Sequence, residues 1–158
     1  MQPSAPSLSE DEVRAIIDRH LALEGPLLPI LHALQEACGH IPEAAREPIC
    51  DALNITRAEL HGVITFYHDF REAPTGRHVL KICRAEACQA MGGAALGEAT
   101  LARLGLGWHG TTANGALTVE PVYCLGLCAC APAAMLNERP VGRVDRARMD
   151  ALLAEAGA

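Results

Sequence analysis

Apolar residues recur at helical spacing in four stretches of the first 70 residues. The first stretch follows Ser9 and a run of acidic residues, a pattern typical of a helix that begins with a capping box. The other three begin at Pro26, Pro42 and Thr56, and each residue type suits a helix start. The expected apolar stripes are Val13, Ile16, Ile17 and Leu21; Leu27, Ile30, Leu31, Leu34 and Cys38; Ala45, Ile49 and Leu53; and Leu60, Val63, Ile64 and Tyr67. The pattern predicts a small helical bundle over residues 9–70.

The pattern changes after the bundle. Residues 71–76 have turn chemistry, and the residues that follow have the short apolar runs of strands. The expected elements are a strand over 78–82, an Ala-rich helix over 89–104, a strand over 117–123, two short strands around Met135 and Val141, and a final helix from about Asp145.

This β-α-β-β-α order predicts a parallel pair of strands followed by a hairpin, as in thioredoxin-like domains. The expected fold class is therefore α+β, an N-terminal helical bundle followed by a thioredoxin-like α/β domain. We expect residues 1–8 to be a flexible N-terminus, residues 9–73 to form the bundle and residues 74–158 to form the α/β domain.

Charge and composition exclude several kinds of partner. The 158 residues carry a formal charge of −6, and the chain lacks the basic block that nucleic acid or anionic lipid selects. Its N-terminus lacks a signal-peptide pattern, and no apolar run approaches the roughly 20 residues of a membrane span. We therefore expect a cytoplasmic protein that neither binds nucleic acid nor inserts into a membrane. In that reducing compartment, seven cysteines favour metal binding or redox chemistry over disulfides.

Four of the cysteines form two pairs, and each pair follows a predicted strand. Cys83 and Cys88 are separated by four residues, and Cys124 and Cys128 by three. If the two strands are neighbours, the pairs converge from loops, and four thiolates suit a [2Fe–2S] cluster. Structural zinc is the alternative, although the wider first gap is at the limit of its usual spacing. A thioredoxin-type dithiol is disfavoured because the chain has no C-x-x-C motif.

Residues 83–89 and 124–137 resemble the thioredoxin-like [2Fe–2S] subunit family, the family of the 24 kDa NADH dehydrogenase subunit of respiratory complex I. Residues 28–42 and 61–67 resemble the helical region of the same family. Within it, the run Cys-Arg-Ala-Glu-Ala-Cys-Gln is most similar to the gamma subunit of soluble, NAD-dependent, molybdenum-containing formate dehydrogenase.

The resemblance implies that Cys83, Cys88, Cys124 and Cys128 hold one [2Fe–2S] cluster in the α/β domain. Cys130 lies outside the family pattern. The chain is then an electron-transfer subunit of an oxidoreductase complex and has no substrate site of its own. FMN and NAD are expected in a flavin- and NAD-binding partner, and the molybdenum cofactor in a catalytic partner that oxidises formate. The helical bundle is expected to dock on the flavin-bearing partner.

Two other parent complexes stay open, namely complex I and an NAD-linked hydrogenase. A protein of a different class is also possible, a non-redox adaptor in which zinc joins the two cysteine loops. We expect Arg84 and Lys81 to be the cations near a cluster whose charge is −2 when oxidised and −3 when reduced.

The remaining motifs favour structural roles. Cys38 and Cys50 are expected to be buried apolar residues of the helices. Residues 105–110 match G-x-G-x-x-G but follow a helix instead of a strand, so we expect a loop and no dinucleotide site. The aromatic run at residues 66–70 is expected to belong mainly to the core at a helix end, and the histidines are assigned no chemistry.

Overall fold

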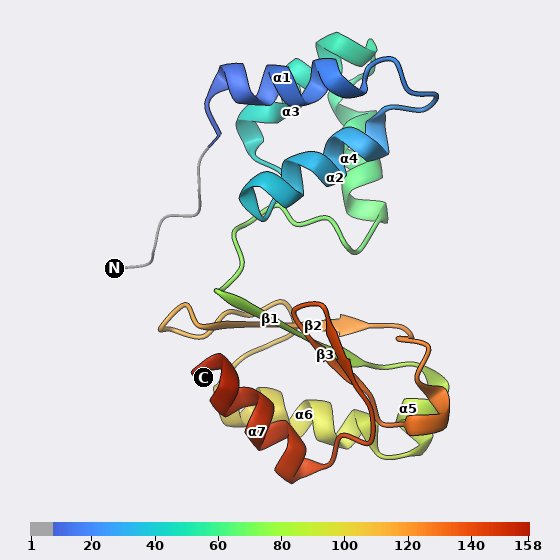
Figure 1. Cartoon of the computed structure of the whole chain (residues 1–158), viewed down its shortest axis with the longest axis vertical. Helices are drawn as coiled ribbons and strands as arrows, with labels where there is room; N and C mark the ends of the chain where they lie inside the picture. The colour runs from blue at the N-terminus through green and yellow to red at the C-terminus, as the bar shows by residue number, and fades with distance from the viewer. Residues whose placement is uncertain (1–7) are drawn as a thin grey trace. The chain divides into compact units, whose positions relative to one another are not determined.

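The computed structural model describes residues 8–158, so the flexible segment expected at residues 1–8 lies almost wholly outside the described residues. The described chain divides into two compact units, a helical unit at residues 8–74 and an α/β unit at residues 75–158 (Figure 1). No helix among residues 8–158 is long and apolar enough to cross a membrane.

The helical unit contains the four helices that the sequence predicts. Its core joins side chains from all four, including Ile16, Leu31, Ile49 and Ile64. This agrees with the expected apolar stripes, because one face of each amphipathic helix is buried against the others. The helices are α1 (Glu10–His20), α2 (Leu27–Cys38), α3 (Glu43–Leu53) and α4 (Arg57–Phe66).

Two residues expected in the apolar stripes lie outside the core. Leu21 is 40% exposed and Tyr67 is 43% exposed. Each follows the last residue of its helix, α1 or α4, and the Tyr67 backbone is extended. The extended backbone takes Tyr67 off the helical period, whereas Leu21 keeps a helical backbone and is exposed at the end of α1.

Pro48 lies inside α3, yet the helix continues to Leu53. Because proline has no N–H, the carbonyl of Ala44, four residues before Pro48, loses its helical hydrogen bond. That position is near the start of α3.

Capping boxes begin α1 and α4, as the sequence predicts. At α4, the Thr56 hydroxyl accepts from the Glu59 N–H at 3.2 Å, and the Glu59 carboxylate accepts from the Thr56 N–H at 2.8 Å. The hydrogen bond from the Thr56 backbone lowers the pKa of Glu59. The carboxylate form therefore stabilises the start of this helix.

Replacing Thr56 with alanine is expected to lower the free energy of unfolding of the helical unit by about 1 kcal/mol. Because the native pKa of Glu59 is below its ordinary value, the carboxylate's contribution is present above that ordinary value. It is lost as the pH falls through the lowered pKa. Amide exchange of α4 at neutral and acidic pH measures both effects. Thr65→Ala is the control, since the Thr65 hydroxyl donates to the His61 and Gly62 carbonyls of the same helix. Equal protection loss in both variants would contradict the capping role.

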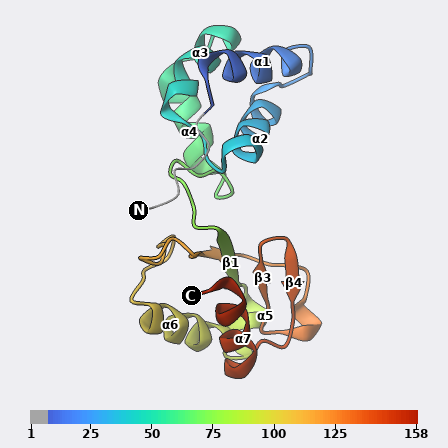
Figure 2. The same ribbon diagram turned by 60° about the vertical axis from the view of Figure 1, so that its left-hand side comes forward.

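The α/β unit is a four-stranded sheet with strand order β2-β1-β3-β4. β1 pairs in parallel with β2, and β3 and β4 form an antiparallel hairpin, which confirms the predicted topology. The two long helices α6 and α7 lie on one face of the sheet (Figure 2). The elements are β1 (His78–Cys83), α5 (Glu86–Ala90), α6 (Gly93–Leu104), β2 (Leu117–Val122), the 3₁₀ turn η1 (Cys128–Cys130), β3 (Ala134–Leu136), β4 (Arg139–Val141) and α7 (Arg146–Ala156).

The single helix expected over residues 89–104 is wrong, because the structure has two helices there. The chain leaves α5 at Met91, and Gly92 adopts a φ of +88°, a left-handed conformation that glycine accepts readily. α6 then begins at Gly93. The break gives α5 its own direction, and α5 carries Cys88.

Strand alternation explains the core of the α/β unit. Leu80 and Ile82 of β1 are buried with Met149 and Leu153 of α7 in one apolar cluster. Lys81 lies on the opposite face of the sheet, since successive strand side chains alternate. The parallel register places it beside Glu120 of β2, a buried carboxylate.

Candidate metal centre

The parallel strands bring the two cysteine pairs to one edge of the sheet. Cys83 is the last residue of β1 and is in register with Val122, the last residue of β2. Cys124 therefore lies two residues beyond the end of the neighbouring strand. The Arg84 N–H donates to the Val122 carbonyl at 2.8 Å and joins the start of one cysteine segment to the other.

The two pairs differ in local structure and exposure. Cys83 and Cys88 are each 2% exposed, whereas Cys124 and Cys128 are exposed. The expectation that both pairs lie in loops is wrong for the first, because Cys83 ends β1 and Cys88 lies within α5. This happens because a helix begins at Glu86, between the two cysteines. The site thus has one buried pair and one solvent-facing pair.

Neighbouring cysteines raise the pKa of one thiol in each pair. The Cys124 and Cys128 sulfurs are 3.8 Å apart. The hydrogen bond with Cys124 is the main cause of the raised pKa of Cys128, and the charges of Cys124 and Cys83 raise it further. Burial raises the pKa of Cys88 first, and its hydrogen bond with Cys83 raises it further. A nearby positive charge would therefore favour the thiolate forms of Cys88 and Cys128.

The backbone of the second segment also suits an anionic sulfur. The Gly126 N–H donates to the Cys124 sulfur at 3.3 Å, and Gly126 has a φ of +73°. Cys124 has a φ of +129°, a region that residues with a Cβ rarely adopt. Strained backbone of this kind is concentrated at ligand-binding sites.

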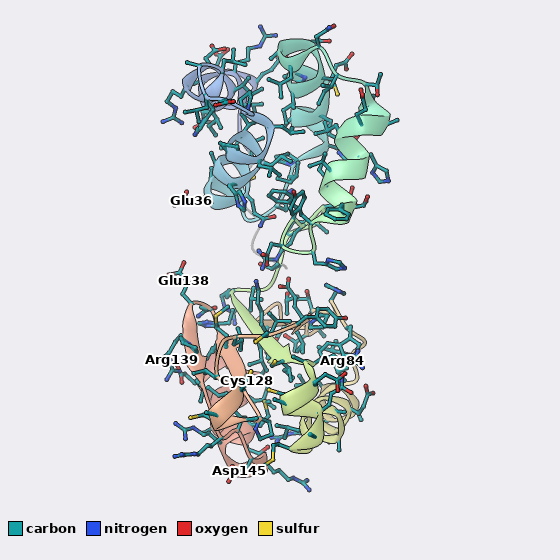
Figure 3. The ribbon with its side chains drawn as sticks, turned by 90° about the vertical axis from the view of Figure 1, so that its right-hand side faces the viewer. Glu36, Arg84, Cys128, Glu138, Arg139 and Asp145 are labelled. Carbon is teal, nitrogen blue, oxygen red and sulfur yellow. The ribbon has the colours of Figure 1, made fainter. Side chains whose placement is uncertain are left out.

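A donor set of four thiols in two pairs fits a [2Fe–2S] cluster, which is held by four thiolates. Within residues 8–158, no three Cys, His, Asp or Glu side chains gather as the ligands of a single metal ion. Cys128 lies in the α/β unit, as does Arg84 (Figure 3).

The family model of the thioredoxin-like [2Fe–2S] ferredoxins matches residues 13–157. This chain belongs to that family. Its place among the thioredoxin-like ferredoxins confirms the predicted resemblance and implies one [2Fe–2S] cluster. The match includes both units.

The chain is similar to subunits of several oxidoreductases, among them two relatives and one solved structure. The chain is 33% identical to an NADH-quinone oxidoreductase subunit of Rhizobium meliloti, over 90% of this chain and 85% of the relative. It is 28% identical to the NADP-reducing hydrogenase subunit HndA of Solidesulfovibrio fructosivorans, over 91% of this chain and 84% of the relative. A crystal structure of an NAD⁺-reducing [NiFe]-hydrogenase matches with a TM-score of 0.66 and 31% identity. That match covers 80% of this chain but only 22% of the hydrogenase chain.

Cys130 of this ferredoxin lies in η1, two residues after Cys128, and is partly buried. The Arg143 N–H donates to its carbonyl at 2.5 Å. A Cβ added to Gly142 would lie 2.7 Å from the Cys130 Cβ, so the segment after β4 packs closely on this residue. Cys130 is therefore packed against the segment at Gly142 and Arg143.

Cys128→Ser is expected to remove the normal cluster spectrum, and Cys130→Ser is expected to preserve it. Both changes replace a sulfur with an oxygen in the same 3₁₀ turn, so each is the control for the other. Iron content and visible absorbance of the two purified variants measure the difference. Loss of the spectrum in Cys130→Ser alone would reassign the fourth ligand to Cys130.

The predictions for the remaining cysteines and motifs have mixed outcomes. Cys38 and Cys50 are buried in the helical core region, as expected, and burial raises the pKa of Cys50. Residues 105–110 form no helix, in agreement with the expected loop. The aromatic run at 66–70 is only partly core, because Phe70 is buried whereas Phe66 is 73% exposed.

One contact near the cysteines was not expected from the sequence. The Arg84 guanidinium lies 5.0 Å from the centre of the Trp108 ring. Trp108 belongs to the glycine-containing loop that follows α6, and no periodic pattern relates it to Arg84. The sequence indicated only that Arg84 follows Cys83, and this gave the expectation of a cation near the site.

Proposed function

We propose that this chain is the electron-transfer subunit of an NAD-linked oxidoreductase complex and that Cys83, Cys88, Cys124 and Cys128 hold its cluster. The observation that supports this most directly is the meeting of the two cysteine pairs at the carboxyl ends of β1 and β2. When bound, the cluster supplies a one-electron store. The chain's own residues supply the four sulfur ligands. The Gly126 N–H donates to the Cys124 sulfur, and Cys83 and Cys88 are buried from solvent.

The exposure of the second pair supports an electron path to a partner. Cys83 and Cys88 are enclosed by the α/β unit, while Cys124 and Cys128 face solvent. Exposed apolar side chains lie next to both cysteine segments, namely Met91 after α5 and Tyr123 before Cys124. A redox partner that covers this surface would approach the ligands of the second pair.

Metal and sulfide analysis of the purified chain tests the ligand proposal. We expect about two irons and two acid-labile sulfides per chain, with a visible spectrum that bleaches with dithionite. A colourless protein with one zinc per chain would overturn electron transfer and support the zinc-joined adaptor.

The helical unit is proposed to dock on the flavin- and NAD-binding subunit. Phe66 and Tyr67 form an exposed edge-to-face aromatic pair at the end of α4, and aromatic residues are enriched in protein interfaces. The unit also carries 12 Asp and Glu against 5 Arg and Lys at residues 8–74, a net charge of −7. These features favour a partner surface with an apolar pocket and a basic rim.

Phe66→Ser combined with Tyr67→Ser tests this docking in the full chain. We expect the variant to keep its cluster spectrum and to lose co-purification with the flavoprotein. Leu23→Ser is the matched control, since Leu23 is an exposed apolar residue of the same unit in the α1–α2 connection. Undiminished assembly of the aromatic variant would place the interface elsewhere.

The parent complex is proposed to be a cytoplasmic, NAD-dependent formate dehydrogenase with a molybdenum-containing catalytic subunit. The support is the run from Cys83 to Gln89, which resembles the gamma subunit of that enzyme. The formate-oxidising groups are then in the partner subunit. Affinity purification from the native source tests this: a molybdopterin-containing chain supports it, whereas membrane subunits or a nickel–iron chain would assign the protein to complex I or a hydrogenase.

A further inference from the structure

Arg84 is held on both sides of its backbone. Its N–H donates to the Val122 carbonyl of β2 at 2.8 Å, and its carbonyl accepts from the Gln89 side-chain amide at 2.6 Å. Gln89 belongs to α5 and directly follows Cys88. The two bonds therefore fix Arg84 between the end of β2 and the helix that carries the second ligand.

The side chain of Arg84 is held by Trp108. The guanidinium lies 5.0 Å from the ring centroid, within the range of a cation–π interaction. The ring itself is positioned by Gly97 of α6, where an added Cβ would lie 3.3 Å from the nearest ring atom. A Cβ at Gly97 would require the ring to shift by a few tenths of an ångström. Trp108 thus packs against α6, and its ring orients the Arg84 guanidinium.

The stacking leaves the charge of Arg84 unneutralised. In the described part of the chain, no carboxylate forms an ion pair with Arg84. By contrast, Arg103 pairs with Asp150 and Arg139 pairs with Glu155. Lys81, the other cation expected near the site, lies beside the Glu120 carboxylate in the strand register. Arg84 is therefore a cation next to Cys83 that, among the described residues, has an aromatic partner and no ion-paired carboxylate.

We propose that Trp108 is a positioning residue that holds Arg84 as a fixed positive charge and thereby raises the reduction potential of the cluster. The proposal rests on the proposed function, in which Cys83 is a ligand. Arg84 directly follows Cys83, and their Cα atoms are about 3.8 Å apart, so the residue next to the proposed ligand carries the positive charge. Reduction adds one negative charge to the thiolate-ligated cluster. A nearby cation stabilises that added charge, and charge and hydrogen bonding around the ligands set the potential.

A redox titration of the full chain, followed by electron paramagnetic resonance, tests the proposal. Arg84→Gln is expected to shift the midpoint potential to a more negative value, while Arg84→Lys keeps it near that of the unmodified chain. Trp108→Leu is expected to give a smaller shift of the same sign, because the charge remains but moves into solvent. Arg77→Gln is the matched control: it removes the same charge just before β1, at the far end of the strand from Cys83.

Iron content separates the possible failures. If the unmodified chain contains no iron–sulfur cluster, the proposed function fails. If all variants hold two irons and their potentials equal that of the unmodified chain, the role of Arg84 is overturned. A shift in Arg84→Lys as large as that in Arg84→Gln also overturns it, since the charge is the same. If Arg84→Gln loses iron, the test depends on Trp108→Leu, which leaves Arg84 and its backbone hydrogen bonds unchanged. An unchanged potential in Trp108→Leu would overturn the positioning role of Trp108.

Discussion

Serine in place of Cys83, Cys88 or Cys124 is expected to reduce bound iron from about two atoms per chain to near zero. Serine offers a hard oxygen where the cluster requires a soft thiolate. Cys83 and Cys88 are each 2% exposed, so water has little access with which to replace the missing ligand. Iron and sulfide analysis after anaerobic purification measures the loss.

Cys38→Ser is the control for this prediction. The Cys38 thiol is buried and donates to the carbonyls of Leu34 and His40. A serine hydroxyl can donate its one proton to either of these carbonyls, so the helical unit is expected to fold and the iron content to stay unchanged. Full iron in Cys83→Ser, with loss in Cys38→Ser, would move the metal site to the helical unit.

The fold was predictable where local patterns decide it. Ser9 and Thr56 begin helices because their side chains satisfy free backbone N–H groups, and the sequence shows both capping boxes. The apolar stripes that include Ile16 of α1 and Ile64 of α4 were equally visible. The pattern failed at Leu21 and Tyr67, since the spacing of apolar residues does not show where the helical backbone ends.

The candidate site was predictable because the cysteines of each proposed ligand pair are close in sequence. The spacing of the cysteines and the strands before them predicted convergence at one sheet edge. The helix around Cys88 was not predicted, because the Ala-rich composition of α5 and α6 hides the turn at Gly92. The stacking of Arg84 on Trp108 joins residues 24 positions apart in different segments, and only the tertiary structure brings them together.

The turn at Gly92 leads to the contact of Gly93 with the backbone of Cys88. A Cβ added to Gly93 would lie 2.6 Å from the Cys88 carbonyl oxygen and 3.0 Å from its carbonyl carbon. Backbone atoms cannot rotate away as a flexible side chain can. A side chain at Gly93 therefore requires α5 to move relative to α6, and Cys88 moves with it.

Gly93→Ala is accordingly expected to destabilise the α/β unit by about 1–3 kcal/mol, the usual cost of overpacking. It is also expected to speed the loss of iron to a chelator, because Cys88, a proposed cluster ligand, is displaced. Gly62→Ala is the matched control. Gly62 lies inside α4 and an added Cβ meets nothing within 4 Å, so alanine there is expected to stabilise the helix by about 0.5–1 kcal/mol. Thermal unfolding and the decay of visible absorbance under chelator compare the two variants. Iron retention in Gly93→Ala equal to that in Gly62→Ala would mean that the α5–α6 contact does not control the position of Cys88.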